Sequence, residues 1–311
     1  MADVLVSGAT SMVGSWFAAN TPRSIAVGGR RDPQLDGGRA ERFDFVDITV
    51  PETLSHCVER SPEPALVNFA ARTDVDGVER ERPASGASGG GPAWTVNIES
   101  VRSIARAVAR TDRFLIQIST DFVFDGRAGP YTETAARSPL SEDVSWYGWT
   151  KSEAERWIEG SGARAAIVRI AYPYGPRFPA KADLPHWILD TWRAHRLPSL
   201  YTDQWLSPTW IPDASMLIDR LLLEPKTGVF HLASPTLTTP FEFGTTVLES
   251  FAETGTGIVR GCSILDSVAP GRAPRPVRGG LSSKRLEKLG VVPTPWQDGV
   301  RKLAEEERGR L

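Results

Sequence analysis

The stretch Val4-Leu-Val-Ser-Gly8-Ala-Thr-Ser-Met-Val-Gly14 decides the fold, because an apolar run turns at a glycine before a helical pattern begins. A strand, a glycine turn and a helix start let the backbone approach a pyrophosphate at a helix N-terminus, whose dipole favours anions. Ser11 takes the place of the middle glycine of the usual dinucleotide fingerprint. The stretch predicts a dinucleotide site that uses Gly8 and Gly14.

Short apolar runs alternate with helical patterns through the first half of the chain. The strand candidates span residues 3–7, 24–27, 43–46, 65–69, 114–119 and 165–170, and the helix candidates span 12–19, 51–59, 93–109 and 144–159. Alternating strands and helices need crossover connections, and continuous apolar runs fit strands covered on both faces. The sequence therefore predicts an α/β fold with a Rossmann-type, doubly wound parallel sheet.

The alternation of strands and helices weakens after residue 171, where prolines and tryptophans accumulate. We expect residues 1–171 to form the dinucleotide-binding domain and residues 172–311 to form mainly a smaller substrate-binding lobe, with late sheet elements returning near 205–235. Helix candidates in this half span residues 185–197, 213–223 and 294–307. The segment Ser85-Gly-Ala-Ser-Gly-Gly-Gly91 predicts a flexible surface loop.

The composition of the chain argues against several classes of protein, including nucleic-acid-binding and membrane proteins. The 311 residues carry 36 basic and 38 acidic side chains, and this formal net charge of -2 gives no support for nucleic-acid binding. Cys57 and Cys262 lie far apart and the four histidines are scattered, so neither a disulfide framework nor a metal site is expected. Without a signal-peptide pattern or an apolar run of about 18 residues, we expect a soluble, cytoplasmic protein that does not bind membranes.

The second strand ends in Ala26-Val-Gly-Gly-Arg30-Arg31-Asp32. NAD-binding domains usually place a carboxylate at the end of this strand, against the ribose 2′-hydroxyl. A guanidinium there can pair instead with a 2′-phosphate. Arg30 and Arg31 therefore predict a preference for NADPH, and the neighbouring Asp32 leaves NADH open as the alternative.

The run Trp146-Tyr-Gly-Trp-Thr-Lys151 places Tyr147 and Lys151 on one face of a helix. Hydride reduction of a ketone leaves an alkoxide, and a tyrosine phenol can supply the proton that it needs. A nearby lysine ammonium favours the phenolate and eases proton cycling near neutral pH. A hydroxyl at the end of the fifth strand, Thr120 or Ser119, can hold the carbonyl oxygen in line. The pattern predicts proton-coupled hydride transfer.

An ordered series of motifs extends this pattern over nearly the whole chain. The motifs are Val67-Asn-Phe-Ala-Ala-Arg-Thr-Asp-Val-Asp76, Val96-Asn97, Ser119-Thr-Asp-Phe-Val-Phe-Asp-Gly126, Gly129-Pro-Tyr-Thr-Glu133, Pro139-Leu140, Tyr147-Gly-Trp-Thr-Lys151, Val168-Arg-Ile-Ala-Tyr-Pro-Tyr-Gly175, Asp203-Gln-Trp-Leu-Ser-Pro-Thr209, Gly228-Val-Phe-His-Leu-Ala233 and Leu281-Ser-Ser-Lys284. With them the chain resembles the extended short-chain dehydrogenase/reductases, and within these the dTDP-4-dehydrorhamnose reductase family.

The resemblance implies roles residue by residue. Those implied for catalysis are Thr120, Tyr147 and Lys151. Those implied for the cofactor are Ser11, Met12 and Val13 on the pyrophosphate turn, Asp47 and Ile48 on the adenine side, and Ala70, Ala71 and Arg72 after the fourth strand. Those implied for the substrate are Asp121 and Tyr172 near the sugar, and Gln204 and Trp205 near the nucleotide.

Two departures from the family pattern concern the expected sugar pocket. Phe122 stands where a tyrosine is usual, and Tyr172 stands where a tryptophan is usual. The related nucleotide-sugar 4,6-dehydratases carry Asp-Glu after the threonine, whereas Phe122 follows Asp121 here. The 3,5-epimerase-reductases need a pocket cysteine and histidine, and neither Cys57 nor Cys262 falls in a suitable place. Simple reduction fits best, and the exact sugar stays open.

The resemblance implies NADPH-dependent reduction of the 4-keto group of a nucleotide-linked 4-keto-6-deoxy sugar. A reductase of a non-sugar ketone in secondary metabolism stays open, because the fold and the catalytic residues do not fix the substrate. A non-catalytic, nucleotide-binding regulatory subunit also stays open, since one relative of the family is the partner of a methionine adenosyltransferase. Relatives are often dimers, so the resemblance allows a homodimer.

Overall fold

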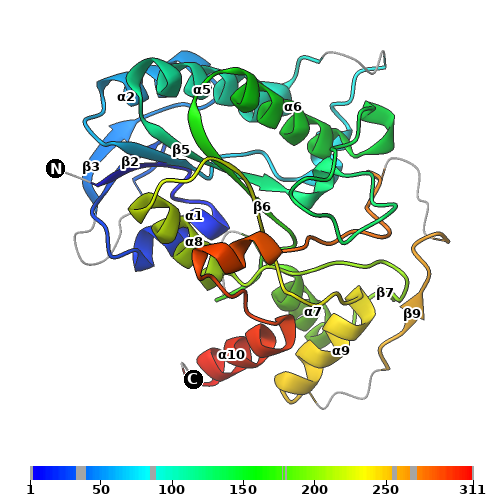
Figure 1. Ribbon diagram of the computed structural model, residues 1–311. Helices are drawn as coiled ribbons and strands as arrows, with labels where there is room; N and C mark the ends of the chain where they lie inside the picture. Colours follow the sequence, from blue (N-terminus) through cyan, green and yellow to red (C-terminus); the bar gives the residue numbers. More distant parts are fainter. Residues whose placement is uncertain are drawn as a thin grey trace.

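A seven-stranded parallel sheet forms the centre of the computed structural model, which describes residues 3–32, 40–84, 89–176, 178, 181–253, 258–266 and 272–309 (Figure 1). The strands, in sheet order, are β3 (Ala40–Phe45), β2 (Ile25–Gly29), β1 (Val4–Ser7), β4 (Ala65–Asn68), β5 (Phe114–Thr120), β6 (Arg164–Ile170) and β8 (Gly228–Leu232). The strand order reverses between β1 and β4. Ligands of such sheets bind at this point, outside the carboxyl ends of the strands.

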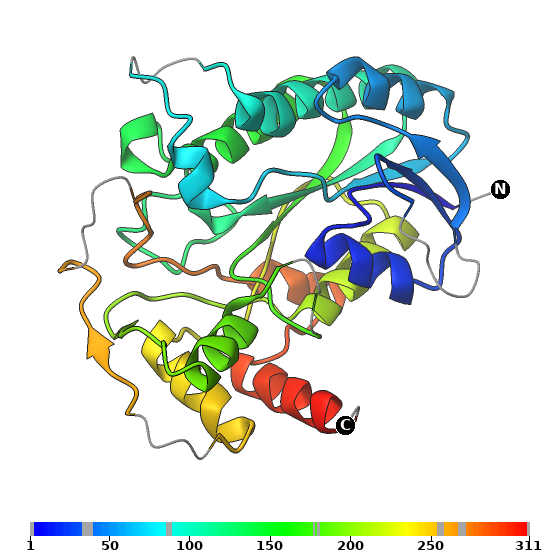
Figure 2. The ribbon, with the colours of Figure 1, turned by 180° about the vertical axis from the view of Figure 1, so that it is seen from behind.

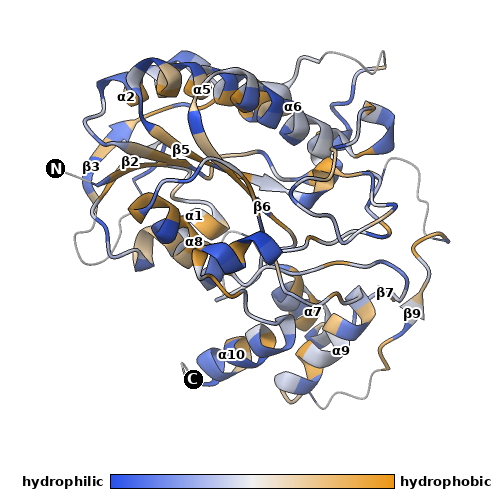
Figure 3. Cartoon of the chain, viewed as in Figure 1, coloured by the Kyte–Doolittle hydropathy of each residue, from blue (hydrophilic) through white to orange (hydrophobic). Residues whose placement is uncertain are grey.

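Helices cover both faces of the sheet (Figures 1 and 2). One face carries α1 (Met12–Asn20) and α8 (Ile211–Leu223), and the other carries α2 (Pro51–Arg60), α5 (Ser100–Thr111) and α6 (Trp146–Gly160). Successive strand residues point to opposite faces, so Val4 and Val6 join the core under α1, whereas Leu5 joins the core under α2 and α5. Because both faces are buried, inner strands such as β2 and β5 are largely apolar, whereas the edge strand β3 carries Glu41, Arg42 and Asp44 (Figure 3).

A smaller helical lobe lies beyond the sheet. It contains α7 (Leu184–Arg193), α9 (Pro240–Ser250) and α10 (Trp296–Arg308), with the short strands β7 (Leu200–Tyr201) and β9 (Gly261–Cys262) at its edge (Figure 1). Its own core gathers around Tyr174, Phe243 and Trp296. The chain also returns to the sheet, since α8, β8 and the 3-10 segment η4 (Lys284–Leu289) pack in the sheet layers.

The predicted α/β fold with a Rossmann-type parallel sheet is confirmed, and the strand and helix candidates of the first half are present with ends shifted by a few residues. The helix expected at 93–109 consists of α4 (Pro92–Trp94), a π-helical segment η1 (Thr95–Glu99) and α5. Two helices were not expected, α3 (Val75–Glu79) and α9. Residues 85–88 of the expected glycine-rich loop lie outside the described residues.

Candidate active site

The turn between β1 and α1 requires glycine because other backbone segments lie very close to it. Gly8 has a φ of +77°, and a Cβ on it would lie 2.5 Å from the backbone nitrogen of Ala70, just after β4. A Cβ on Gly14 would overlap the carbonyl oxygen of Gly8. Ser11 Oγ accepts a hydrogen bond from the Gly14 amide at 3.2 Å and caps α1. The serine that replaces the middle glycine therefore serves as the helix cap.

A cavity of about 500 Å³ opens at the carboxyl ends of β1, β2 and β4. The expected cofactor residues that line it are Gly8, Ser11, Arg30, Arg31, Ile48, Ala70, Ala71 and Arg72. Thr10, Thr49, Pro92 and Val96 also line it, and the sequence analysis assigned them no role. Met12, Val13, Gly14 and Asp47 are neighbours of the lining residues in sequence but do not line the cavity themselves.

These residues fit a phosphorylated dinucleotide. The N-terminus of α1 offers unpaired backbone amides and a partial positive charge to a pyrophosphate. Arg30 and Arg31 add two guanidinium groups beyond the end of β2, which suit a further phosphate. The cavity thus has the charge and the donors that NADPH requires.

Asn97 connects the cofactor cavity to α6. Its side-chain oxygen accepts a hydrogen bond from the Arg72 amide at 2.8 Å, and its side-chain nitrogen donates to the Arg72 carbonyl at 3.1 Å and to Thr150 Oγ1 at 3.0 Å. It lies in the π-helical segment η1, and such segments are frequent at functional sites. Sequence reasoning had only noted Asn97 within a motif, without a role.

Thr120, Tyr147 and Lys151 come together between β5 and α6. Ser145 caps α6 by accepting a hydrogen bond from the Gly148 amide at 3.1 Å, so the helix begins just before Tyr147. The Thr120 hydroxyl faces the Tyr147 phenol closely enough to oppose the rise of its pKa. Lys151 Nζ donates to the Ile118 carbonyl at 2.8 Å. These contacts place a phenol and a hydroxyl side by side, with an ammonium group bound to the same strand.

The two candidate hydroxyls at the end of β5 have different partners. Ser119 Oγ donates to Glu155 Oε1 at 2.5 Å, whereas Thr120 Oγ1 faces the Tyr147 phenol and donates to Asp121 Oδ1 at 3.3 Å. Of the two hydroxyls, Thr120 is therefore the one placed to meet a ligand at the phenol.

Burial controls the proton affinities of this group. It raises the pKa of Tyr147 well above its usual range, the Thr120 hydroxyl opposes this, and the charge of Asp121 adds to it. Burial lowers the pKa of Lys151 to about 8, while the charge of Glu155 acts to raise it. The sequence led us to expect that Lys151 lowers the pKa of Tyr147. Here the ammonium group is bound to Ile118, and desolvation outweighs the other influences on the phenol.

Asp121 is a buried carboxyl with one unsatisfied oxygen. Its side chain follows Thr120 directly and is 3% exposed, and its Oδ2 has no hydrogen-bond partner among the described residues. Burial raises its pKa to about 7. Its charge also raises the pKa values of Tyr147 and Tyr172, so the carboxyl faces both phenols. A polar ligand between the two phenols could satisfy this oxygen.

The remaining expected substrate residues lie on the other side of Phe122. The Phe122 ring centroid is 5.9 Å from that of Tyr147 and 6.2 Å from that of Tyr172. Gln204 Nε2 donates to Tyr172 Oη and to the Pro276 carbonyl, both at 3.1 Å. Tyr172 has a φ of +42°, a strained conformation of the kind that gathers at ligand sites. Trp205, next to Gln204, is 39% exposed.

Arg275 and Asp76 complete this region, although the sequence analysis assigned no role to either. Arg275 Nη2 pairs with Asp76 Oδ2 at 2.9 Å, and the Ala273 amide donates to Asp76 Oδ1 at 3.0 Å. The Arg275 guanidinium also lies 6.0 Å from the centroid of the Phe122 ring. The paired residues are 199 positions apart, so no local pattern could have joined them.

The part of the chain that the structure describes contains no group of three histidine, cysteine or acidic side chains that could hold a metal ion. Its helices are all too short or too polar to cross a membrane.

Comparison with known proteins places this geometry in a family. A family model described as the RmlD substrate binding domain matches residues 1–308. The dTDP-4-dehydrorhamnose reductase of Burkholderia thailandensis is 30% identical over 312 residues, which cover 96% of each chain. Methionine adenosyltransferase 2 subunit beta of Mus musculus is 27% identical over 310 residues, which cover 96% of this chain and 86% of the relative.

Solved structures show the same fold. The dTDP-4-dehydrorhamnose reductase of Clostridium acetobutylicum has a TM-score of 0.81 at 22% identity, covering 98% of this chain and 99% of that one. That of Bacillus anthracis, solved in complex with NADP, has a TM-score of 0.77 at 23% identity and covers 97% of both chains. The fold is thus shared along almost the whole length, and the family model and the Burkholderia relative show that the chain belongs to the RmlD family of extended short-chain dehydrogenase/reductases.

Proposed function

We propose that this protein is an NADPH-dependent oxidoreductase that reduces the 4-keto group of a nucleotide-linked 4-keto-6-deoxy sugar. The observation that carries the proposal is the convergence of Tyr147, Thr120 and the unsatisfied carboxyl of Asp121. Asn97 ties this group to the lining of a cavity that fits a dinucleotide. The relatives named dTDP-4-dehydrorhamnose reductase support the substrate class, and the relative solved with NADP supports the cofactor.

Reduced nicotinamide, when bound, supplies the hydride that the carbonyl carbon accepts. Thr120 donates a hydrogen bond to the carbonyl oxygen and holds it in line. Tyr147 transfers its phenolic proton to that oxygen as the C–O double bond becomes a single bond, so the ketone gains one hydride and one proton. The raised pKa of the buried phenol keeps this proton in place until an alkoxide develops. Lys151 holds the ribose next to the nicotinamide.

The cofactor is held by the first part of the chain in this proposal. The turn from Gly8 to Gly14 binds the pyrophosphate, and Arg30 and Arg31 bind the 2′-phosphate. Asp47 and Ile48 contact the adenine side, and the backbone from Ala70 to Arg72 lies beside the nicotinamide half. Residues 1–171 form the dinucleotide-binding domain, and residues 172–311 supply mainly the substrate lobe.

The substrate is held across Phe122. Asp121 and Tyr172 bind hydroxyl groups of the sugar, and Gln204 and Trp205 contact the nucleotide. Asp121 near its pKa of about 7 can donate or accept a hydrogen bond, which suits a sugar hydroxyl that can also do both.

The decisive experiment follows the loss of reduced-nicotinamide absorbance when purified protein is mixed with NADPH and dTDP-4-keto-6-deoxyhexose. We expect rapid oxidation that depends on the sugar nucleotide. The same mixture without the sugar serves as the control for uncoupled oxidation. If NADPH binds and no sugar-dependent oxidation follows, the sugar reductase proposal fails.

A second candidate is a regulatory subunit, and the 27% identity to methionine adenosyltransferase 2 subunit beta over 96% of this chain favours it. Stable co-elution with a methionine adenosyltransferase, together with no reduction of any ketone offered, would support this role. A non-sugar ketone is the third candidate, because Phe122 and Tyr172 change the pocket from the family pattern. Oxidation of NADPH with simple ketones but not with the sugar nucleotide would favour it.

A further inference from the structure

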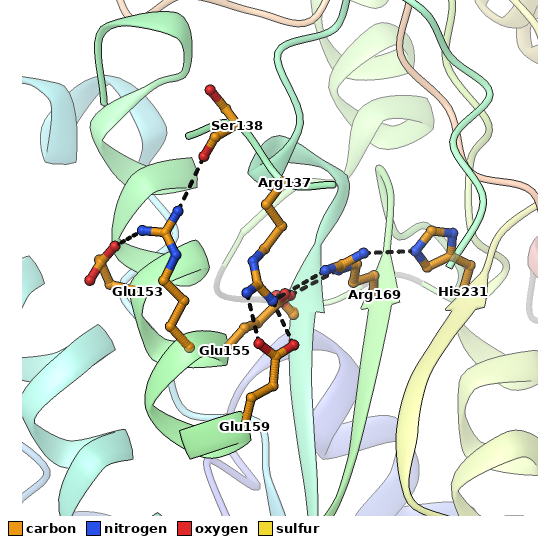
Figure 4. A network of polar contacts seen from close by, with 9 residues as sticks. Arg137, Ser138, Glu153, Glu155, Glu159, Arg169 and His231 are labelled. Carbon is orange, nitrogen blue, oxygen red and sulfur yellow. Dashed lines mark hydrogen bonds and ion pairs between the residues drawn. The ribbon is translucent and has the colours of Figure 1, made fainter. Parts of the chain in front are cut away.

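A network of charged groups joins α6 to β6, β8 and the loop before α6 (Figure 4). At its centre is Glu155 on α6, one turn after Lys151 and 1% exposed. Arg169 on β6 binds both of its carboxylate oxygens, with Nε at 3.0 Å from Oε1 and Nη2 at 2.6 Å from Oε2. Arg137 Nη1 adds a third charged contact at 2.8 Å. A buried carboxylate with so many donors stays ionised, and its pKa is lowered by Arg169, Ser119 and Arg137 against burial.

The network contacts the catalytic strand at its end. Ser119 Oγ donates to Glu155 Oε1 at 2.5 Å, and Ser119 lies between Ile118 and Thr120. The Ile118 carbonyl accepts the hydrogen bond from Lys151, and the Thr120 hydroxyl faces the Tyr147 phenol. Helix α6 thus contacts the end of β5 at two points, through Lys151 and, one helical turn later, through Glu155.

We propose that Glu155 is a positioning residue for the reduction, whose negative charge keeps Lys151 protonated while its bond to Ser119 fixes the strand end that carries Thr120. The statement that Glu155 positions groups for the reduction rests on the proposed function. The statement that Glu155 keeps Lys151 protonated rests only on the contacts of Glu155. Lys151 is 3% exposed, and within the described part of the chain its ammonium group donates to the neutral Ile118 carbonyl, so a nearby negative charge is what offsets the cost of burying its cation.

Several other charged and titratable groups lie around Lys151 and Glu155, and they affect the charge near Lys151 differently. They are Arg137 from the loop before α6, Glu159 on α6, Arg169 on β6, His231 on β8, and Tyr147 and Asp121 on the ligand side. His231 is neutral, since burial and Arg169 lower its pKa to about 3. The two arginines balance Glu155 and Glu159. Removing Glu155 therefore leaves an excess of positive charge beside Lys151, whereas removing Arg137 leaves an excess of negative charge.

The test measures the protonation of Lys151 without cofactor or ketone. The chain has six lysines, so the side-chain ¹³Cε signals of labelled lysine can be followed against pH and the Lys151 signal assigned by its loss in Lys151→Arg. We expect the wild-type midpoint near 8. Glu155→Gln should lower it by about one unit, as loss of a close opposite charge does. Arg137→Gln should raise it, because Glu155 is then less neutralised.

Glu159→Gln is the matched control, because Glu159 lies one turn further along α6 and shares Arg137 but is 46% exposed. Its midpoint should stay at the wild-type value. An unchanged midpoint in folded Glu155→Gln overturns the inference, and so does a shift of Glu155→Gln and Arg137→Gln in the same direction, which a merely structural role would produce. If Glu155→Gln does not fold, the Arg137→Gln variant alone decides. The inference is then overturned if the Lys151 midpoint of Arg137→Gln does not rise above the wild-type value.

Activity measurements then connect the charge to catalysis. The alkaline limb of kcat should move to lower pH in Glu155→Gln by the same amount as the Lys151 midpoint, since a neutral lysine appears earlier as pH rises. A wild type that reduces no ketone, with lysine midpoints that shift as described, refutes the proposed function and leaves the electrostatic inference standing.

Discussion

The cofactor cavity and the proposed substrate pocket, which is the group of buried side chains around Phe122, are built by different means. The cavity at β1, β2 and β4 is lined largely by glycine, alanine, serine and threonine, and its two arginines at the end of β2 are exposed. The pocket around Phe122 is lined by ionisable groups taken out of water, among them Tyr147, Lys151 and Asp121. The shape of the cavity depends on backbone segments that lie very close together. The properties of the pocket depend on burial, which changes the pKa values of its side chains.

This difference means that the two regions should fail in different ways. A change in the cavity should show as strain or as weaker cofactor binding, with little dependence on pH. A change in the pocket should show as a change in turnover or in the response to pH.

The largest expected effect is in the pocket, for Tyr147→Phe. The variant lacks the proton donor and keeps the ring, so we expect kcat to fall about 10³-fold, within the range of general acid catalysis. The dissociation constant of NADPH should change by no more than about twofold, because the phenol is not a phosphate ligand. Steady-state kinetics and a fluorescence titration measure both. In Tyr172→Phe, the control, KM should change more than kcat. Turnover within tenfold of wild type in Tyr147→Phe would exclude the phenol as the donor.

Next in size is Gly8→Ala, which tests the close approach of the cavity backbone. The residue needs a positive φ, and its Cβ would meet the Ala70 backbone, so we expect a loss of about 3 kcal/mol in the free energy of unfolding. Gly162 is the control, since its φ is also +77° but a Cβ there meets nothing within 4 Å. Gly162→Ala should cost only about 1 kcal/mol. Equal losses in urea denaturation would show that the contact with Ala70 is unimportant.

Asp121→Asn tests the desolvated carboxyl through pH. Folding raises the pKa of Asp121 from 3.8 to about 7, so the folded state binds the proton more tightly than the unfolded state. The wild type therefore loses stability as pH rises from about 4 to about 7, and the loss is complete above that range. The amide does not titrate, so the stability of Asp121→Asn relative to wild type should grow over this range.

Asp47→Asn is the control for this pH dependence. Hydrogen bonds from Thr49 lower the pKa of Asp47, so it is ionised in both states throughout the same range. Its difference from wild type should be flat between pH 5 and pH 8, which thermal melts can show. A flat difference for Asp121→Asn as well would mean that Asp121 is hydrated in solution.

The smallest effect is expected for the double variant Arg30→Ala and Arg31→Ala. Loss of the guanidinium groups should weaken NADPH binding by about tenfold, the worth of one charge-assisted contact at a partly exposed site. NADH binding should change little, because NADH has no 2′-phosphate. Wild-type protein that binds NADH as tightly as NADPH would contradict the assignment of these arginines.

Local patterns were enough to predict most of the sheet. The strands that become β1, β4, β5 and β6 are apolar runs buried on both faces, so their sequence signal does not depend on their neighbours. Helix α9 also has a local signal that we did not use. Thr239 and Glu242 form a capping box before an apolar stretch, which is a start signal for a helix.

The candidate site was predictable only where it is contiguous. Tyr147 and Lys151 share one helix turn, and Gly8, Ser11 and Gly14 share one turn between β1 and α1. Asp76 and Arg275 meet because the segment that contains Ala273 and Arg275 lies against α3, and the partners of Glu155 come from β5, β6 and a loop. Such meetings depend on the path of the whole chain.

By itself the sequence determined the α/β order of elements and the family, and it supplied the candidates for the reactive side chains, because these follow from residue type and from spacings shorter than a helix. The tertiary structure decided which hydroxyl of Ser119 and Thr120 faces Tyr147, that Asp121 is left with an unsatisfied oxygen, and that Lys151 is bound to a carbonyl with Glu155 behind it. It also decided that the phenol of Tyr147 has a raised pKa. The reason is physical: the proton affinity of a side chain depends on the water and the charges within a few ångströms of it, and folding alone brings these together from distant parts of the chain.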